Sequence, residues 1–296
     1  MPRRPGANGF YFPMIGGVSG YLFLARENEN LQPARGQASP SIKPVEELAA
    51  PVKVMDGATV TNDSHSKRPV ESTGRRDKKM NLDEHQILLS NWQARCTDGT
   101  FISDGPIDPS RWSNAKPRVL FLAKEAYGEM GPGQTWDLPE LVREVWREPK
   151  GNFWWNLGYW AYGIQHQLRV GEVPSSPWTG GKHWKEDVWD SVLQSAIVNL
   201  KKIHGYPESN DDDLRQYVHN HGDLLRRQVE CLSPDVMVCC YTWHLVEGHV
   251  WEHAESISEL VFRLDDMLVL DFWHPANRYP NVLCYYAALG LLQRAL

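Results

Sequence analysis

The sequence predicts an α/β protein in which helices cover a central, parallel, four-stranded sheet. The first observation is that short apolar runs alternate with longer segments of helical periodicity after Pro117, which is typical of a parallel sheet. The second is that four runs have the length and apolar content of buried strands: RVLFLA (118–123), SAIVNL (195–200), DVMVCC (235–240) and MLVLDF (267–272). We therefore expect a three-layer α/β/α sandwich.

The sequence defines two of the covering helices well. The helix before the third strand is the clearest, because residues 209–213 supply caps and negative charge at its start and Pro234 follows its end. Its predicted buried stripe comprises Leu214, Tyr217, Val218, Leu225, Val229 and Leu232. The last helix is expected to follow Asn281, with a buried stripe of Leu283, Tyr286, Ala287 and Leu291.

Composition divides the chain into two parts. From Glu27 to Lys79 the sequence is rich in Pro, Ser, Gly, Asn and charged residues and lacks apolar periodicity, which indicates disorder. Met80 then opens the amphipathic run MNLDEHQILLSNW. We expect a poorly structured N-terminal extension over residues 1–79 and one catalytic domain over residues 80–296. The early apolar stretch 10–25 is interrupted by Pro and Gly and is too short to cross a bilayer, so no membrane association is expected.

Charge and cysteine content exclude several classes of protein. The net charge is −6, and residues 1–79 hold 12 of the 31 Lys and Arg but 8 of the 37 Asp and Glu, so residues 80–296 are net −10. A strongly basic nucleic-acid footprint is absent, and DNA contact would require a local basic patch. The five cysteines form no C-x-x-C pair, which argues against a disulfide scaffold or a zinc ribbon and favours a reducing cytoplasm.

A segment rich in Trp, Gly and Pro fits the alternating pattern poorly. It spans residues 128–190 and includes the runs GNFWWNLGYWAYG and SSPWTGGKHW. One interpretation is a satellite hydrophobic cluster beneath long loops. The other is an aromatic-lined pocket or stacking surface for a nucleobase.

Polar residues follow each predicted strand, where an open parallel sheet binds its ligands. The first strand leads to Glu125 and Glu129, the second contains Asn199 near its end, and the fourth leads to Asp271 and His274. A carboxylate, an amide and an imidazole are therefore expected at one edge of the sheet. Hydrolysis of an N-glycosidic bond needs such a set: a carboxylate for the sugar cation or the water, a donor for the leaving base, and an amide for the base edge.

Four motifs occur in an order and spacing that we can compare with a known family. They are KEAYG (124–128), AIVNLKK (196–202), SPDVMVC (233–239) and WHPANR (273–278). Over roughly residues 115–296 the chain resembles the uracil-DNA glycosylase superfamily, in which a GEAPG-like motif, a strand ending in Asn, a P-D-x-[IV] strand and a late H-P-[SA] motif follow one another.

The resemblance implies roles by position. Glu125 would activate water or stabilise the sugar cation, Asn199 would read the base, and His274 would donate to the leaving base. The remaining implied residues are Tyr127 and Trp273 for base binding, Lys201, Lys202 and Arg278 for DNA phosphates, and Glu129 and Asp271 as reserve carboxylates. Tyr127 stands where the family motif has proline and Lys124 replaces its first glycine, so the loop that holds the base differs.

The implied activity is that of a monofunctional DNA glycosylase. It would flip a uracil or a modified pyrimidine out of DNA, including a hypermodified phage base such as glucosylated hydroxymethylcytosine, and leave an abasic site. The setting would be base-excision repair or anti-phage defence.

Other classes of function were weighed against this one. A non-catalytic nucleic-acid or nucleotide-binding module on the same fold is the alternative, whereas a serine hydrolase is disfavoured because G-x-S-x-G is missing. No cofactor is implied, and the cysteines lack the arrangement of an iron–sulfur cluster. His249 and His253 are spaced like a metal pair but are expected to be ordinary helix surface, so no metal is predicted.

Overall fold

The computed structural model describes residues 80–96, 99–127, 135–205 and 208–296. The extension expected over residues 1–79 lies outside the described residues. The elements are α1 (Leu82–Arg95), β1 (Phe101–Ser103), β2 (Gly105–Pro106), α2 (Pro109–Asn114), β3 (Val119–Tyr127), β4 (Thr135–Asp137), α3 (Leu138–Glu140), the π-helical turn η1 (Leu141–Trp146), α4 (Gly151–Val170), the 3-10 turn η2 (Pro177–Thr179), α5 (Trp184–Leu193), β5 (Ala196–Gly205), α6 (Asp211–Leu232), β6 (Val236–Cys240), α7 (Trp243–Val246), β7 (Glu255–Ser258), β8 (Val261–Leu264), β9 (Met267–Phe272) and α8 (Asn281–Gln293).

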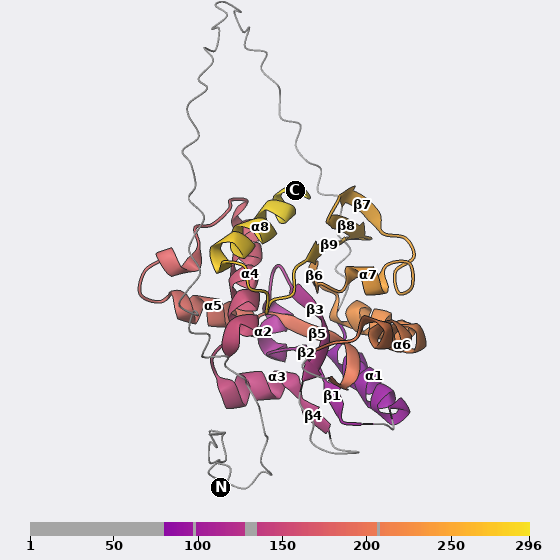
Figure 1. Cartoon of the computed structure of the whole chain (residues 1–296). Helices are drawn as coiled ribbons and strands as arrows, with labels where there is room; N and C mark the ends of the chain where they lie inside the picture. Colours follow the sequence, from indigo (N-terminus) through magenta and orange to yellow (C-terminus); the bar gives the residue numbers. More distant parts are fainter. Residues whose placement is uncertain (1–79, 97–98, 128–134, 206–207) are drawn as a thin grey trace, which may run out of the picture. The chain divides into compact units, whose positions relative to one another are not determined.

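The fold is α/β, with a mixed, mostly parallel open sheet flanked by helices (Figure 1). The predicted strands correspond to β3, β5, β6 and β9, and the pairs β5–β3, β3–β6 and β6–β9 are all parallel. Along the sheet these strands run in the order β5, β3, β6, β9. β5, the second of the four in the sequence, therefore lies on one side of β3, the first, and β6, the third, lies on its other side.

The sheet is larger than the predicted one. Over the described residues it has nine strands, with β1 and β4 beyond β5, and β8 and β7 beyond β9. β8 pairs antiparallel with β9 and β7 antiparallel with β8. These additional strands are only two to four residues long, and several carry polar side chains, as in ESIS (255–258). A strand that short has too few alternations for sequence periodicity to detect.

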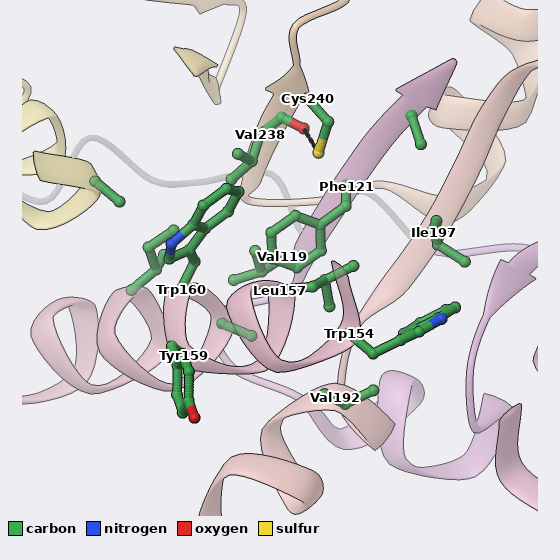
Figure 2. Packing of buried hydrophobic residues seen from close by; sticks show 14 of the residues in the cluster. Val119, Phe121, Trp154, Leu157, Tyr159, Trp160, Val192, Ile197, Val238 and Cys240 are labelled. Atoms are coloured by element: carbon green, nitrogen blue, oxygen red, sulfur yellow. Dashed lines mark hydrogen bonds between the residues drawn. The ribbon is translucent and has the colours of Figure 1, made fainter. Parts of the chain in front are cut away.

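Two hydrophobic cores lie on opposite faces of the sheet. On β3, Val119 and Phe121 belong to the core formed with α4, α5 and α8, whereas Leu120 and Leu122 belong to the core formed with α1, α6 and α7. This alternation is that expected of a strand buried on both faces. Figure 2 shows Val119 and Phe121 facing Leu157 and Trp160 of α4.

The tryptophans of the Trp-rich segment are largely packing residues. Trp160 is fully buried, and Trp154 and Trp136 are 6% and 8% exposed. The neighbouring Trp146, Trp155, Trp178, Trp184 and Trp189 are partly buried against the same core. The hydrophobic-cluster interpretation is therefore favoured for this segment. No helix among the described residues is long and apolar enough to cross a membrane.

The helix predicted before the third strand is confirmed. α6 begins after Asn210, whose side chain accepts hydrogen bonds from the backbone N–H groups of Asp212 and Asp213. The whole predicted stripe is buried: Leu214, Tyr217, Val218, Leu225, Val229 and Leu232.

The predicted stripe of the last helix is half correct, because Ala287 and Leu291 are partly buried against the core whereas its other two residues are exposed. Leu283 and Tyr286 are 51% and 43% exposed, and the buried residues of α8 are Cys284, Tyr285, Ala288, Leu289 and Leu292. α8 is apolar on almost every side, so its spacing does not define one face. Contact with α4 defines it instead: a Cβ on Gly163 would lie 2.8 Å from atoms of both Tyr285 and Leu289, so these side chains fill the space that the glycine leaves.

Leucine-to-alanine substitutions on α8 test this phase. Leu289→Ala should lower the free energy of unfolding by about 2–5 kcal/mol, because it opens a cavity beside Gly163. The matched control Leu283→Ala should change it by less than about 0.5 kcal/mol, because that side chain is exposed. Urea unfolding measures both, and the reverse ranking would restore the predicted stripe.

Candidate functional site at the carboxyl ends of the parallel strands

The parallel strands end together at one edge of the sheet, and their order places a topological switch point between β3 and β6. The connection from β3 to β5 contains α4 and α5 on one face, and the connection from β5 to β6 contains α6 on the other. The chain leaves β3 toward the face of α4 and α5, and it leaves the neighbouring strand β6 toward α7, on the face of α6. Open α/β sheets bind ligands at such a point.

Glu125 is buried at the end of β3. Its side chain is 5% exposed, and Lys201 Nζ lies 3.5 Å from Oε2. Lys201 also pairs with Asp213 in the first turn of α6. The carboxyl group lies over Gly205, where a Cβ would fall 2.2 Å from Glu125 Cδ. Oε2 is shielded from solvent and has no hydrogen-bond partner among the described residues, so a ligand or a water molecule could bind it only if this edge of the sheet opened.

A second group of polar side chains surrounds Lys124. Lys124 Nζ donates to Asp211 Oδ1 at 2.6 Å and lies 5.0 Å from the centroid of the Tyr241 ring. Asp211 Oδ2 is also 3.2 Å from His244 Nε2. The hydrogen bond from Lys124 is the main reason that the pKa of Asp211 is lowered. Asp211 is therefore ionised and balances the charge of Lys124.

Tyr241 has an unusual backbone conformation at the end of β6. Its φ is +59°, a left-handed value that a large side chain rarely adopts. Its N–H donates to the carbonyls of Cys239 at 2.9 Å and Phe272 at 2.7 Å, which holds the turn in place. The side chain is 54% exposed. Strained residues of this kind cluster at functional sites.

His274 lies in the loop after β9 as an uncharged donor. Its Nδ1 accepts a hydrogen bond from the N–H of Ala276 at 3.2 Å, so the neutral ring carries its proton on Nε2. Burial lowers its pKa, and the positive charge of Lys124 lowers it further. The Phe153 ring of α4 lies 5.5 Å from the imidazole, centroid to centroid. At neutral pH the imidazole can therefore donate through Nε2.

The loop that carries His274 is held from two sides. The His274 carbonyl accepts from the backbone N–H of Asn277 at 3.0 Å and from its Nδ2 at 2.8 Å. The Pro275 carbonyl accepts from Nδ2 of Asn156 at 2.6 Å, and Asn156 is buried in the first turns of α4. These bonds fix the imidazole relative to the sheet.

Asp271 is a second acid near the same edge. Burial raises its pKa to about 6, an effect that nearby His244 opposes and Glu247 reinforces. An acid that titrates close to neutrality at this edge of the sheet is suited to proton transfer. The sequence identified it as a reserve carboxylate.

Asn199 lies deeper in the sheet than Glu125. The strand register pairs Asn199 with Ala123 and Lys201 with Glu125, which places Asn199 about 7 Å further from the strand ends. Asn199 is 2% exposed. Its backbone N–H and its Nδ2 both donate to Asp104 Oδ2, at 2.7 Å and 3.1 Å.

The predicted phosphate contact by Lys202 is wrong. Lys202 is fully buried, and its Nζ donates to both carboxylate oxygens of Asp104 at 2.7 Å and 2.8 Å. Burial lowers the pKa of its ammonium group, and the charge of Asp104 opposes that effect. Successive side chains on a strand point to opposite faces, so adjacent lysines meet different surroundings. Lys201 is engaged by carboxylates, which leaves Arg278 as the exposed member of the three predicted contacts.

The same buried network reaches two helices. Gln228 of α6 donates through Nε2 to Asp104 Oδ1 at 2.8 Å and lies 3.1 Å from Nε2 of His85 in α1. Burial lowers the pKa of His85 to about 4, although the charge of Asp104 acts in the other direction. Lys202 Nζ lies 4.9 Å from the centroid of a Trp92 ring.

The remaining predicted site residues are distributed around the edge. Tyr127, the last residue of β3, pairs with Gly205 in the register. The Trp273 ring lies 5.1 Å from Phe272 and 4.8 Å from Tyr279, centroid to centroid. Glu129 lies outside the described residues.

Sequence reasoning missed Asp104 and Asn156. Asp104 lies in ISDGP, where Asp-Gly resembles a turn, and Asn156 lies within the Trp-rich run. Their partners are 95 and 119 residues away, so no local pattern could have identified them.

The chain was also compared with known proteins. No protein-family model matches the sequence, and no curated protein matches it. Over the described ranges no group of three or more His, Cys, Asp and Glu side chains is arranged to hold a metal ion. Two surface hollows, lined by residues such as Arg111 and Asp190 in one and Glu84 and Arg227 in the other, contain none of the predicted site residues.

The buried network predicts a specific acid sensitivity. The pKa of His85 is 6.5 in the unfolded chain and about 4 in the folded protein. Between pH 4 and pH 6.5 the unfolded chain therefore binds a proton at His85 that the native state does not bind. Stability is therefore lost as pH falls from 6.5 toward 4, and at pH 4.5 this group should account for about 2–3 kcal/mol. His85→Gln should abolish that part of the loss in urea unfolding at pH 7 and 4.5. His183→Gln, at a side chain that is 74% exposed, should behave as the unsubstituted protein does; equal losses in all three proteins would contradict the assignment.

Proposed function

We propose that this protein is a monofunctional DNA glycosylase of the uracil-DNA glycosylase superfamily, with a uracil-DNA glycosylase-like three-layer arrangement around β5, β3, β6 and β9. One observation carries the proposal. A buried carboxylate, Glu125 near the end of β3, and a neutral imidazole donor, His274 after β9, lie at the carboxyl edge of the parallel strands, and the amide of Asn199 lies on β5, next to β3. The reaction needs these three types of group.

Glu125 is proposed to act at the sugar. As the C1′–N bond breaks, positive charge develops on the sugar ring, and a carboxylate beside it stabilises that charge. In this proposal Glu125 orients the attacking water and takes its proton once the edge opens around Oε2, which is shielded from solvent and lacks a hydrogen-bond partner among the described residues. Lys201 balances the carboxylate charge, and Asp213 holds Lys201 in place.

His274 is proposed to act at the base. The electron pair of the broken C1′–N bond remains on the base, so the leaving group is an anion with charge on its ring oxygens. A neutral imidazole donating from Nε2 stabilises this charge without having to lose a proton in the process. The lowered pKa of His274 and the bond from Ala276 to Nδ1 both favour this state.

Aromatic residues at this edge of the sheet suit a flipped nucleotide. Tyr241 exposes an aromatic ring at the end of β6, and Tyr127 and Trp273 lie at the ends of neighbouring strands. Aromatic faces stack on an extruded base and repay part of the few kcal/mol that unstacking costs. Arg278 is exposed in the His274 loop and could meet a phosphate. The acidic domain predicts weak non-specific binding.

The substrate is proposed to be uracil or a modified pyrimidine. Lys124 and Tyr127 replace the first glycine and the proline of the GEAPG-like motif. Lys124 is tied to Asp211 and Tyr241, a set of contacts that glycine could not make. This difference in the base loop favours a base other than, or in addition to, unmodified uracil, and with it a role in defence against phage DNA or in repair.

Excision assays test the proposal. DNA oligonucleotides carrying uracil, 5-hydroxymethylcytosine or glucosylated hydroxymethylcytosine are incubated with the full chain, and abasic sites are scored as alkali-labile breaks. At least one base should be released, and Glu125→Gln and His274→Ala should each slow the single-turnover rate by about 10²–10⁴-fold. Glu172→Gln and His183→Ala are the matched controls. Both positions are exposed and lie outside the proposed site, so both variants should retain full activity.

The contrary outcome is also defined. If the protein binds these oligonucleotides but releases none of the bases, and neither Glu125→Gln nor His274→Ala changes its affinity, the glycosylase assignment fails. The same result would favour a nucleic-acid-binding module on this fold.

A further inference from the structure

The Asp104 carboxylate occupies a gap in the hydrogen-bonding of the sheet. β1 pairs with β5 at Ile203 and β2 pairs with β5 at Ile197, so the stretch of β5 around Asn199 has no strand partner on that side. Asp104 connects β1 to β2, and its Oδ2 accepts the backbone N–H of Asn199 in place of a strand carbonyl. The side chain of Asp104 is fully buried.

The charge of Asp104 fixes the orientation of the Asn199 amide. Nδ2 donates to Asp104 Oδ2 at 3.1 Å. The reverse orientation would bring Oδ1 against a buried carboxylate oxygen, which places two acceptors in contact without a proton between them. Gln228 donates to the other oxygen, Oδ1, so both oxygens of Asp104 act as acceptors.

We propose that Asp104 is a positioning residue that sets which pyrimidine edge the site accepts. This inference rests on the proposed function, in which Asn199 reads the base. Uracil-type bases present N3–H beside a carbonyl, whereas cytosine-type bases present an unprotonated N3 beside an amino group, so donor and acceptor exchange places. An amide held in one orientation can form hydrogen bonds with both groups of one of these edges. Against the other edge it would place donor against donor and acceptor against acceptor.

The proposal explains why a charged pair is buried beneath the site. Lys202 neutralises Asp104 and also donates to the Asn199 carbonyl at 2.8 Å, so it holds the main chain of the same residue. A neutral side chain at position 104 could still accept the backbone N–H of Asn199. Because both bonds from Asn199 end on Oδ2, an acceptor at that position opposes the flipped amide, and only a side chain without one would permit it.

Selectivity between matched bases tests the role of Asp104. Single-stranded oligonucleotides carry uracil or cytosine, or 5-hydroxymethyluracil or 5-hydroxymethylcytosine, so that within each pair only the edge that Asn199 would read differs. The double variant Asp104→Leu/Lys202→Met removes the acceptor that Asn199 uses and both buried charges together, which avoids leaving either charge unpaired. The control Gln228→Met removes a different donor to Asp104 and leaves the bonds to Asn199 intact.

The double variant is expected to change the ratio of kcat/KM between the two bases of a pair, and not only the rate of excision. The unsubstituted protein should favour one base of the more reactive pair by at least about tenfold in kcat/KM, the order expected for an opposed hydrogen-bonding edge. The double variant should reduce that ratio to within about threefold, whereas Gln228→Met should keep it even if it lowers stability.

A spectroscopic readout follows the amide without catalysis. In ¹⁵N-correlated NMR spectra of the full chain, the Asn199 side-chain amide, assigned through Asn199→Ala, should show one slowly exchanging, downfield proton that is lost in the double variant but kept in Gln228→Met.

The outcomes separate two failures. If the unsubstituted protein releases none of the four bases or the glucosylated base, the proposed function is wrong and this inference falls with it. If it is active and the double variant keeps the same preference, or the Asn199 amide is unprotected in the unsubstituted protein, the glycosylase proposal stands and the role of Asp104 is overturned.

Discussion

The buried ion pair between Asp104 and Lys202 is the interaction on which the arrangement of the sheet edge depends. Both side chains are fully buried, and taking two charges out of water costs several kcal/mol for each ion. The cost is offset because Asp104 accepts from Lys202, Asn199 and Gln228 at once. A single carboxylate thereby joins β5 to α6 and closes the gap between two very short strands.

This arrangement gives adjacent residues of β5 different tasks. Lys202 anchors the network in the core on the α6 face, and Lys201 reaches the strand end and pairs with Glu125. Period-two alternation along a strand makes this division possible, because one residue separates the two faces. The stability of the sheet and the chemistry at its edge are thus linked through one strand, and Asn199, bonded to Asp104, belongs to both.

The sequence predicted the long buried elements and missed what depends on distant partners. RVLFLA, SAIVNL, DVMVCC and MLVLDF all correspond to strands, because a strand buried on both faces must be apolar throughout. α6 was equally clear, since its polar and apolar faces are distinct. α8 was placed correctly but its buried stripe was only half correct, because Gly163, which fixes its contact, lies on α4. At the site, Glu125 and His274 could be selected from position after a strand, whereas the burial of Lys202 follows from Asp104, 98 residues earlier, and has no signature of its own.

The close approach of Gly205 to Glu125 limits how this edge of the sheet can change. Because a methyl group at position 205 would occupy the space of the carboxyl carbon, the two positions are coupled: any larger residue at 205 requires the acid to adopt another rotamer, away from Lys201. A change in an apparently inert backbone residue would then relocate a negative charge. Divergent versions of this chain should therefore keep the small residue wherever they keep the acid, and lose both together.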